Sequence, residues 1–124
     1  MDASRLNEIA NHDEVRPHMG GDGDGLVDFT AFALNPANIC FVGEHACFLC
    51  HKLEAGLYEV HSMVLPEGRG AYALECVREG LRFMFCATDC IEIVTRCPDG
   101  NGAALGLARA AGFQETFRRE RIWA

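Results

Sequence analysis

The stretch LYEVHSMVLPEGRGA, residues 57–71, decides the fold. Its first part, Leu57 to Leu65, is rich in β-branched and other apolar side chains, which predicts a strand that Pro66 to Gly70 then breaks. From Ala71 onward, apolar residues recur at the three-to-four spacing of an amphipathic helix; they are Leu74, Val77, Leu81, Met84 and Phe85. Because a further strand follows at Ile91–Thr95, we expect a right-handed crossover with a parallel strand pair.

The segments around this crossover complete the prediction. Upstream, Ile39–Val42 and Ala46–Leu53 are β-rich runs separated by short turns, so three antiparallel strands in hairpin succession are expected. Downstream, Asn101 can cap a helix that runs through Ala111, and Gly112 stands where a left-handed C-terminal cap is wanted. We also expect short helices within residues 4–19 and 27–34, a Gly/Asp loop at 20–25, and a last strand at Phe117–Trp123.

The predicted class is α+β, with a mixed, mainly antiparallel sheet flanked by helices and a parallel crossover around the helix at 71–87. The 124 residues, 49% of them hydrophobic, suit one domain, with a helical part at 1–37 and a sheet core at 38–124. A net charge of −7 disfavours nucleic acid as a partner. No apolar run is long enough for a membrane span and no signal-peptide core is visible, so we expect a cytoplasmic protein without a membrane partner.

The loop before the helix carries the first candidate site. A strand end, a glycine-rich turn and a helix N-terminus aim several free backbone N–H groups at one spot, which suits a phosphate or pyrophosphate. Arg69 adds a fixed positive charge with bidentate geometry. The same spacing is also typical of an ordinary strand-to-helix loop.

From Met63 to Gly70, then through the helix, the strand Ile91–Thr95, Asn101 and the pair Gly112-Phe113, the chain resembles the GNAT superfamily of N-acetyltransferases. The resemblance covers about residues 38–118. It implies that acetyl-CoA lies where the strand ending near Leu65 splays from the strand at Ile91–Thr95, and that the acyl acceptor is a small-molecule or protein amine. Short GNAT-like chains also look similar to phage and prophage proteins, which implies the cytoplasm of a bacterium or a phage-infected host.

The resemblance also implies roles for individual residues. Backbone groups of Met63, Val64 and Leu65 would meet the pantetheine arm of acetyl-CoA. The remaining cofactor-binding residues, which would serve mainly the pyrophosphate, are Gly68, Arg69, Gly70, Ala71 and Asn101.

Glu59 and His61 form the candidate catalytic pair. Alternation along a strand places both on one face, where a carboxylate and an imidazole can take the proton of an ammonium group. Ser62 is a candidate proton donor. The alternative interpretation is a half-exposed strand with a surface glutamate and a packed histidine.

Three departures from the family pattern support a second hypothesis. Tyr72 and Leu74 stand where the family loop has glycine or a small residue, and Ala108 stands where many members have a tyrosine that protonates the leaving thiolate. The alternative hypothesis is therefore a catalytically inactive GNAT-like binding or assembly module. A phage-associated module is one form of this hypothesis. The oligomeric state is open. The arginines at 118, 119 and 121 could either prevent the last strand from pairing with another chain or form part of a dimer contact.

The string Cys47-Phe48-Leu49-Cys50-His51 raises the question of a metal. Cys47 and Cys50 should project from opposite faces of a strand, whereas His45, Cys47 and His51 share one, so a zinc site is conceivable. No second ligand pair follows at finger-like spacing. We therefore expect no metal and interpret the cysteines as reduced core thiols.

Overall fold

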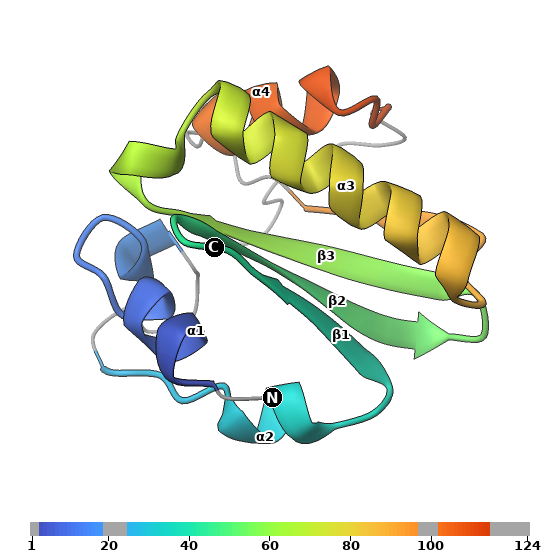
Figure 1. Ribbon diagram of the computed structural model, residues 1–124, viewed down its shortest axis with the longest axis horizontal. Helices are drawn as coiled ribbons and strands as arrows, with labels where there is room; N and C mark the ends of the chain where they lie inside the picture. The colour runs from blue at the N-terminus through green and yellow to red at the C-terminus, as the bar shows by residue number, and fades with distance from the viewer. Residues whose placement is uncertain (1–2, 19–24, 97–101, 115–124) are drawn as a thin grey trace, which may run out of the picture.

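The computed structural model describes residues 3–18, 25–96 and 102–114 (Figure 1). The elements are α1 (Ser4–Ala10), a 3-10 turn η1 (Arg16–His18), α2 (Thr30–Leu34), β1 (Asn38–Val42), β2 (Ala46–Glu54), β3 (Leu57–Val64), η2 (Pro66–Gly68), α3 (Ala71–Ala87), β4 (Glu92–Val94) and α4 (Gly102–Ala110). The predicted last strand, Asn101 and nearly all of the Gly/Asp loop lie outside the described residues. No described helix is long and apolar enough to span a membrane.

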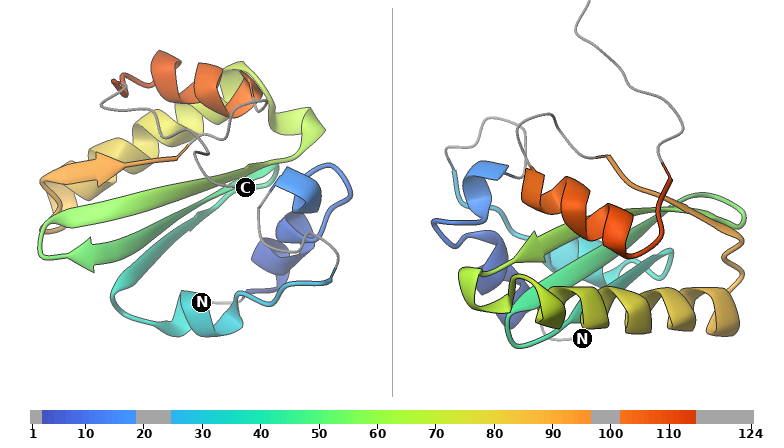
Figure 2. Two further views of the ribbon diagram at one scale, coloured as in Figure 1. Left: turned by 180° about the vertical axis from the view of Figure 1, so that it is seen from behind. Right: turned by 90° about the horizontal axis from the view of Figure 1, so that it is seen from above.

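The sheet has the strand order β1-β2-β3-β4. The first three strands pair antiparallel, whereas β3 and β4 pair parallel, with α3 as the crossover between them. The views in Figure 2 show α3 and α4 on one side of the sheet and α1 and α2 on the other. The predicted α+β class, the mixed sheet and the parallel crossover are confirmed.

Local signals predicted the central elements closely and the N-terminal ones less well. The helix predicted at 27–34 is shorter, because α2 begins only at Thr30. The residues before it are extended and held by asparagine side chains of the first helical segment. Asn11 accepts a hydrogen bond from the Val27 N–H at 2.7 Å and donates one to the Val27 carbonyl at 2.8 Å, and Asn7 accepts from the Phe29 N–H at 2.7 Å. These contacts satisfy the backbone without a helix, and no local pattern encodes them.

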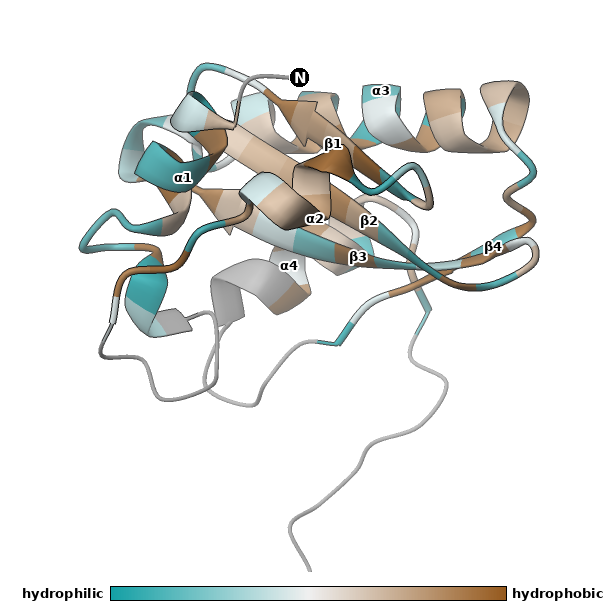
Figure 3. Cartoon of the chain, turned by 90° about the horizontal axis from the view of Figure 1, so that it is seen from below, coloured by the Kyte–Doolittle hydropathy of each residue, from teal (hydrophilic) through white to brown (hydrophobic). Residues whose placement is uncertain are grey.

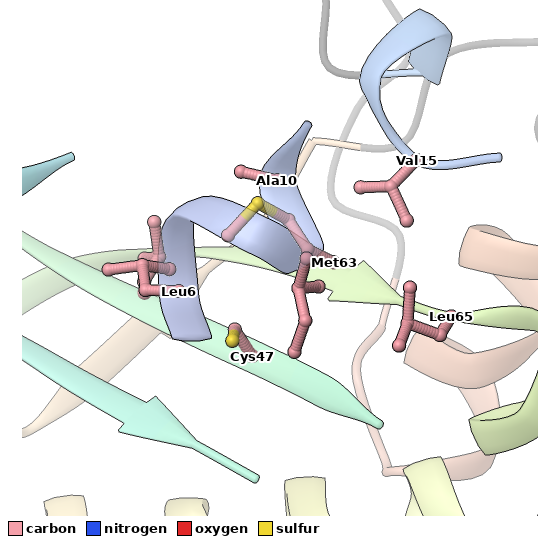
Figure 4. Close-up of a cluster of buried hydrophobic side chains, with 8 residues drawn as sticks. Leu6, Ala10, Val15, Cys47, Met63 and Leu65 are labelled. Atoms are coloured by element: carbon pink, nitrogen blue, oxygen red, sulfur yellow. The ribbon is translucent and has the colours of Figure 1, made fainter. Parts of the chain in front are cut away.

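Each face of the sheet has its own apolar core. On the face covered by α1, the buried residues are Leu6, Ile9, Ala10, Val15, Cys47, Leu49, Met63 and Leu65. Figure 4 shows side chains of α1 meeting those of β2 and β3. On the face covered by α3, the buried residues are Cys50, Tyr58, Met84 and Cys90. The two-residue alternation predicted for β3 is confirmed, and Figure 3 shows the sheet strands as largely apolar.

A polar cluster fastens the loop after α3 to the sheet. Asp89 accepts hydrogen bonds from the Tyr58 hydroxyl at 2.7 Å and from the Lys52 Nζ at 2.9 Å. These bonds, the one from Tyr58 first, lower the pKa of Asp89 to about 2. The cluster therefore joins β2, β3 and the α3–β4 loop at the end of the sheet where β3 and β4 are paired.

The pKa of Asp89 gives a prediction on stability. Because the folded value of about 2 lies below the ordinary 3.8, the carboxylate stabilises the fold above about pH 4, and this contribution is lost as the pH falls from about 4 toward about 2. We expect Asp89→Asn to destabilise the protein clearly at pH 7 and less at pH 3, as measured by urea unfolding. Asp13→Asn changes an exposed aspartate and is the matched control. It should leave the free energy of unfolding unchanged at both pH 7 and pH 3. An equal loss at both pH values for Asp89→Asn would contradict the assignment.

Candidate functional site

The candidate site begins where β3 and β4 stop pairing. The parallel register covers only Leu57 to Glu59 of β3, against Glu92 to Val94 of β4. One residue further, the hydroxyl of Thr95 donates a hydrogen bond to the Val60 carbonyl at 3.1 Å. A side chain thus replaces the next backbone donor of the ladder, and the parallel pairing ends there.

Two hydrogen bonds fix the direction in which the backbone of β3 points. The Val60 carbonyl faces β4, whereas the Leu65 N–H points the other way and donates to the His45 carbonyl at 2.9 Å. Because successive residues of a strand alternate between its two edges, Ser62 and Val64 turn their N–H and C=O groups toward the β4 side. Within the described parts of the chain, no strand pairs with them on that edge.

The three residues expected at the pantetheine arm are therefore not equivalent. Val64 presents backbone groups to the open edge of β3. The alternation directs the backbone of Met63 toward β2, and its side chain is buried in the core. Leu65 is also buried, and its N–H is already donated to His45. Backbone contacts at this edge belong to Ser62 and Val64.

Glu59 and His61 lie together on the α1 face of β3. The Oε1 atom of Glu59 is 3.7 Å from the Nε2 atom of His61, and its Oε2 atom is 3.2 Å from the Nε atom of Arg96. The side chain of Glu59 is only 11% exposed, against 53% for His61 and 85% for Arg96. Ser62 is exposed on the opposite face, so the structure does not bring it to the other two candidates.

The loop from β3 to α3 is shaped by two glycines. Gly70 has a φ of +84°, a conformation that other residues rarely adopt, and an added Cβ would meet nothing within 4 Å. Gly68 instead packs so closely that a Cβ would lie 2.8 Å from the His45 carbonyl oxygen. The loop therefore leaves open space at Gly70, next to the start of α3.

The N-terminus of α3 has free donors. Its N-cap residue, Gly70, makes no side-chain cap and no acidic residue lies in the first turn. The first backbone bond of the helix is from the Leu74 N–H to the Gly70 carbonyl, at 3.1 Å. The N–H groups of residues 71–73 thus have no backbone acceptor in the described part of the chain. Exposed Arg69 immediately precedes the N-cap residue Gly70.

Tyr72, which departs from the family pattern, is engaged by the turn between β1 and β2. Its hydroxyl accepts a hydrogen bond from the His45 N–H at 3.2 Å, and the two rings lie 5.3 Å apart. A Cβ at Gly43 would lie 2.8 Å from the same hydroxyl. The tyrosine therefore ties the first turn of α3 to the hairpin turn.

The cysteine and histidine string does not form a cluster. Cys47 belongs to the core under α1 and Cys50 to the core under α3, as predicted from alternation. Burial raises the pKa of Cys47 to about 11 and that of Cys50 to about 12, so both are thiols at neutral pH in the metal-free protein. The His45 ring meets the Tyr72 ring edge to face, whereas the His51 ring lies 5.9 Å from that of Phe32. No group of three possible metal ligands was found among the described residues.

A groove of about 360 Å³ lies elsewhere, between the edge strand β1 and α3. Its lining includes Phe41 and Phe48 of the sheet and Cys76, Glu79 and Gly80 of α3. Neither Glu59 nor His61 lines it, so the groove and the candidate catalytic pair are separate features.

Thr95 and Arg96 are the site residues that the sequence did not reveal. They lie directly after β4, a short strand that carries no motif. Their importance comes from the register between β3 and β4, which brings them beside Val60 and Glu59. The only sequence signal is their place at the end of the strand predicted at Ile91–Thr95, of which Thr95 is the last residue and which Arg96 follows.

The architecture defined by this sheet, its crossover and its diverging strands is a GNAT-like fold. Among solved structures, it is similar to a point mutant of spermidine N-acetyltransferase SpeG from Vibrio cholerae, with a TM-score of 0.62 and 18% identity. The match covers 72% of this chain and 58% of that protein, so the chain spans less than two thirds of its length. No family model matches the sequence, and no curated protein matches it either.

The loop geometry predicts opposite outcomes for two glycine substitutions. Gly70→Ala forces a Cβ into the left-handed region and should lower the free energy of unfolding by about 1–2 kcal/mol. Gly106→Ala, in α4, meets nothing within 4 Å and should raise it by about 0.5–1 kcal/mol, because alanine favours the helix. Urea unfolding measures both. A neutral Gly70→Ala would show that the loop does not hold the conformation described here.

Proposed function

We propose that this protein is an acyl-CoA-dependent N-acyltransferase that transfers an acetyl group from acetyl-CoA to an amine. The observation that carries the proposal is the end of the β3–β4 ladder after Glu59. Among the described residues, it leaves the backbone groups of Ser62 and Val64 without a strand partner, on a strand that continues through η2 to the N-terminus of α3, where no side chain caps the helix. The GNAT-like fold supports the same conclusion.

The start of α3 fits the pyrophosphate of acetyl-CoA. Free N–H groups at a helix N-terminus bind anions, and the helix dipole adds a favourable field. Gly70 leaves space for close approach, and Arg69 supplies a cation that can bind two phosphate oxygens. The side chain of Tyr72 is held by the hairpin turn.

The open edge of β3 fits the pantetheine arm and the thioester. An amide-containing arm can pair with strand backbone as an added strand does. A backbone N–H aimed at the thioester carbonyl would stabilise the negative charge that develops on its oxygen. Ser62 and Val64 are the two residues whose backbone N–H groups could donate to this oxygen. Transfer at this edge is direct and needs no covalent intermediate with the protein.

The acceptor is an amine, and the charge of the protein favours a cationic one. The net charge of −7 raises the local concentration of positively charged substrates. The similar solved structure is named for its action on spermidine, which makes polyamines the first acceptors to screen here. Glu59 and His61 supply the base that removes the ammonium proton.

Binding of acetyl-CoA tests the proposal. We expect a 1:1 isotherm by calorimetry and a rise of several degrees in the melting temperature at ligand a hundredfold above Kd, where linkage contributes about 2.7 kcal/mol. Arg69→Ala should weaken binding about tenfold or more, because a charged contact to phosphate is lost. Arg82→Ala removes an exposed arginine farther along α3 and should leave the affinity unchanged.

Two other results would contradict the proposal. Equal affinities for acetyl-CoA in the unaltered protein and in Arg69→Ala would show that the pyrophosphate does not lie at the start of α3. Tight binding without transfer to any polyamine, amino acid or peptide amine would support the inactive GNAT-like binding module instead.

A further inference from the structure

The cluster of Glu59, His61 and Arg96 joins two strands that have stopped pairing. Val94 is in register with Glu59, so Arg96 occupies the position that would face His61 if the ladder continued. All three side chains therefore belong to the same face of the sheet. At this point, side-chain contacts replace the backbone contacts of the ladder.

Each carboxylate oxygen of Glu59 faces a different side chain of the cluster. Its Oε1 faces the imidazole of His61 and its Oε2 faces the guanidinium of Arg96. Its side chain is almost buried, and a buried carboxylate needs such partners to remain charged. His61 differs, because its ring is half exposed and only its Nε2 atom faces Glu59. The Nδ1 atom lies on the other edge of the ring.

We propose that Arg96 is a positioning residue for the acyl transfer, which holds Glu59 against His61 so that His61 acts as the base. This inference rests on the proposed function and assigns separate roles to Glu59, His61 and Arg96. In this arrangement a proton on Nε2 of His61 would point to the Glu59 carboxylate, 3.7 Å away, and would leave the lone pair on Nδ1 for the amine. A third group that orients the base is a recurrent arrangement in enzymes that transfer protons.

The reaction balances with this one base. His61 Nδ1 takes one proton from the ammonium group, and the freed nitrogen lone pair forms a bond to the thioester carbonyl carbon. The C–S bond then breaks, and the thiolate of coenzyme A leaves with the electron pair. The thiolate takes a second proton from the former amine nitrogen, and His61 releases its own proton to solvent.

The groups around His61 allow a clear electrostatic test. On β2, apolar Leu49 is the Cα partner of His61 and titratable His51 is that of Glu59, with the His51 Nδ1 atom 2.8 Å from the Asn38 Oδ1 atom. On α1, the charged residues Arg5 and Glu8 pair with each other. Among the ion pairs of the described residues, those that reach the His61 ring are Glu59 directly and Arg96 through Glu59. Removing the charge of Glu59 and removing that of Arg96 should therefore shift the pH dependence of the reaction in opposite directions.

The experiment is the pH profile of kcat/KM for acetyl transfer in the unaltered protein and in four variants. His61→Ala should lower kcat by about 10²- to 10⁴-fold and remove the acid limb of the profile. Arg96→Gln should lower kcat by about 10- to 100-fold, leave the KM for acetyl-CoA unchanged and move the acid limb to higher pH, because the charge of Glu59 then acts on His61 alone. Glu59→Gln should move the limb to lower pH, and Arg96→Lys should recover part of the activity.

Arg82→Ala is the matched control and should leave the profile unchanged. An acid limb that survives in His61→Ala but disappears in Glu59→Gln would overturn the proposal, because Glu59 would then be the base. Unchanged kcat and pH profile in Arg96→Gln would overturn the role of Arg96 while the proposed function stands. No transfer by the unaltered protein would overturn the proposed function together with this inference.

Discussion

The rest of the candidate site depends on the point at which the parallel ladder between β3 and β4 ends. Backbone groups of a buried strand need partners, so a ladder that ends inside a sheet leaves donors for something else to bind. Here the ladder ends at Glu59 and Val94, and the hydroxyl of Thr95 closes it. If the pairing continued to Val64, β4 would take up the backbone groups of Ser62 and Val64, and the edge proposed to hold the thioester would be closed.

The two ends of β3 are held by different contacts. At the paired end, Asp89 binds Tyr58 of β3 and Lys52 of β2. The central strand β2 is buried on both faces from Ala46 to Cys50. It contributes Cys47 and Leu49 to the core under α1 and Cys50 to the core under α3. At the other end, His45 binds both Leu65 and Tyr72, which fixes the loop before α3. The open edge is thus bounded by two fixed points.

The sequence predicted the elements whose signals are local. Glycine and proline breaks and the change from a two-residue to a three-to-four-residue period were enough for the first three strands and α3. The faces of Glu59 and His61 followed from the same alternation, which Met63 and Tyr58 confirm by their burial in separate cores. The start of α2 was placed too early, because distant asparagine side chains hold the segment before it. Arg96 could not be predicted, since its contact depends on the β3–β4 register.

Under the proposed function, Ala108 limits the ways in which the leaving thiolate can be protonated. The resemblance to N-acetyltransferases would place a tyrosine there to protonate the departing thiolate, and alanine cannot donate a proton. The amine nitrogen, however, still carries a second proton after the C–N bond forms, and that proton can pass to sulfur. One base is then sufficient, and it must act on the amine alone. The half-exposed imidazole proposed as the base would meet this requirement, because it could release its proton to solvent after each turnover.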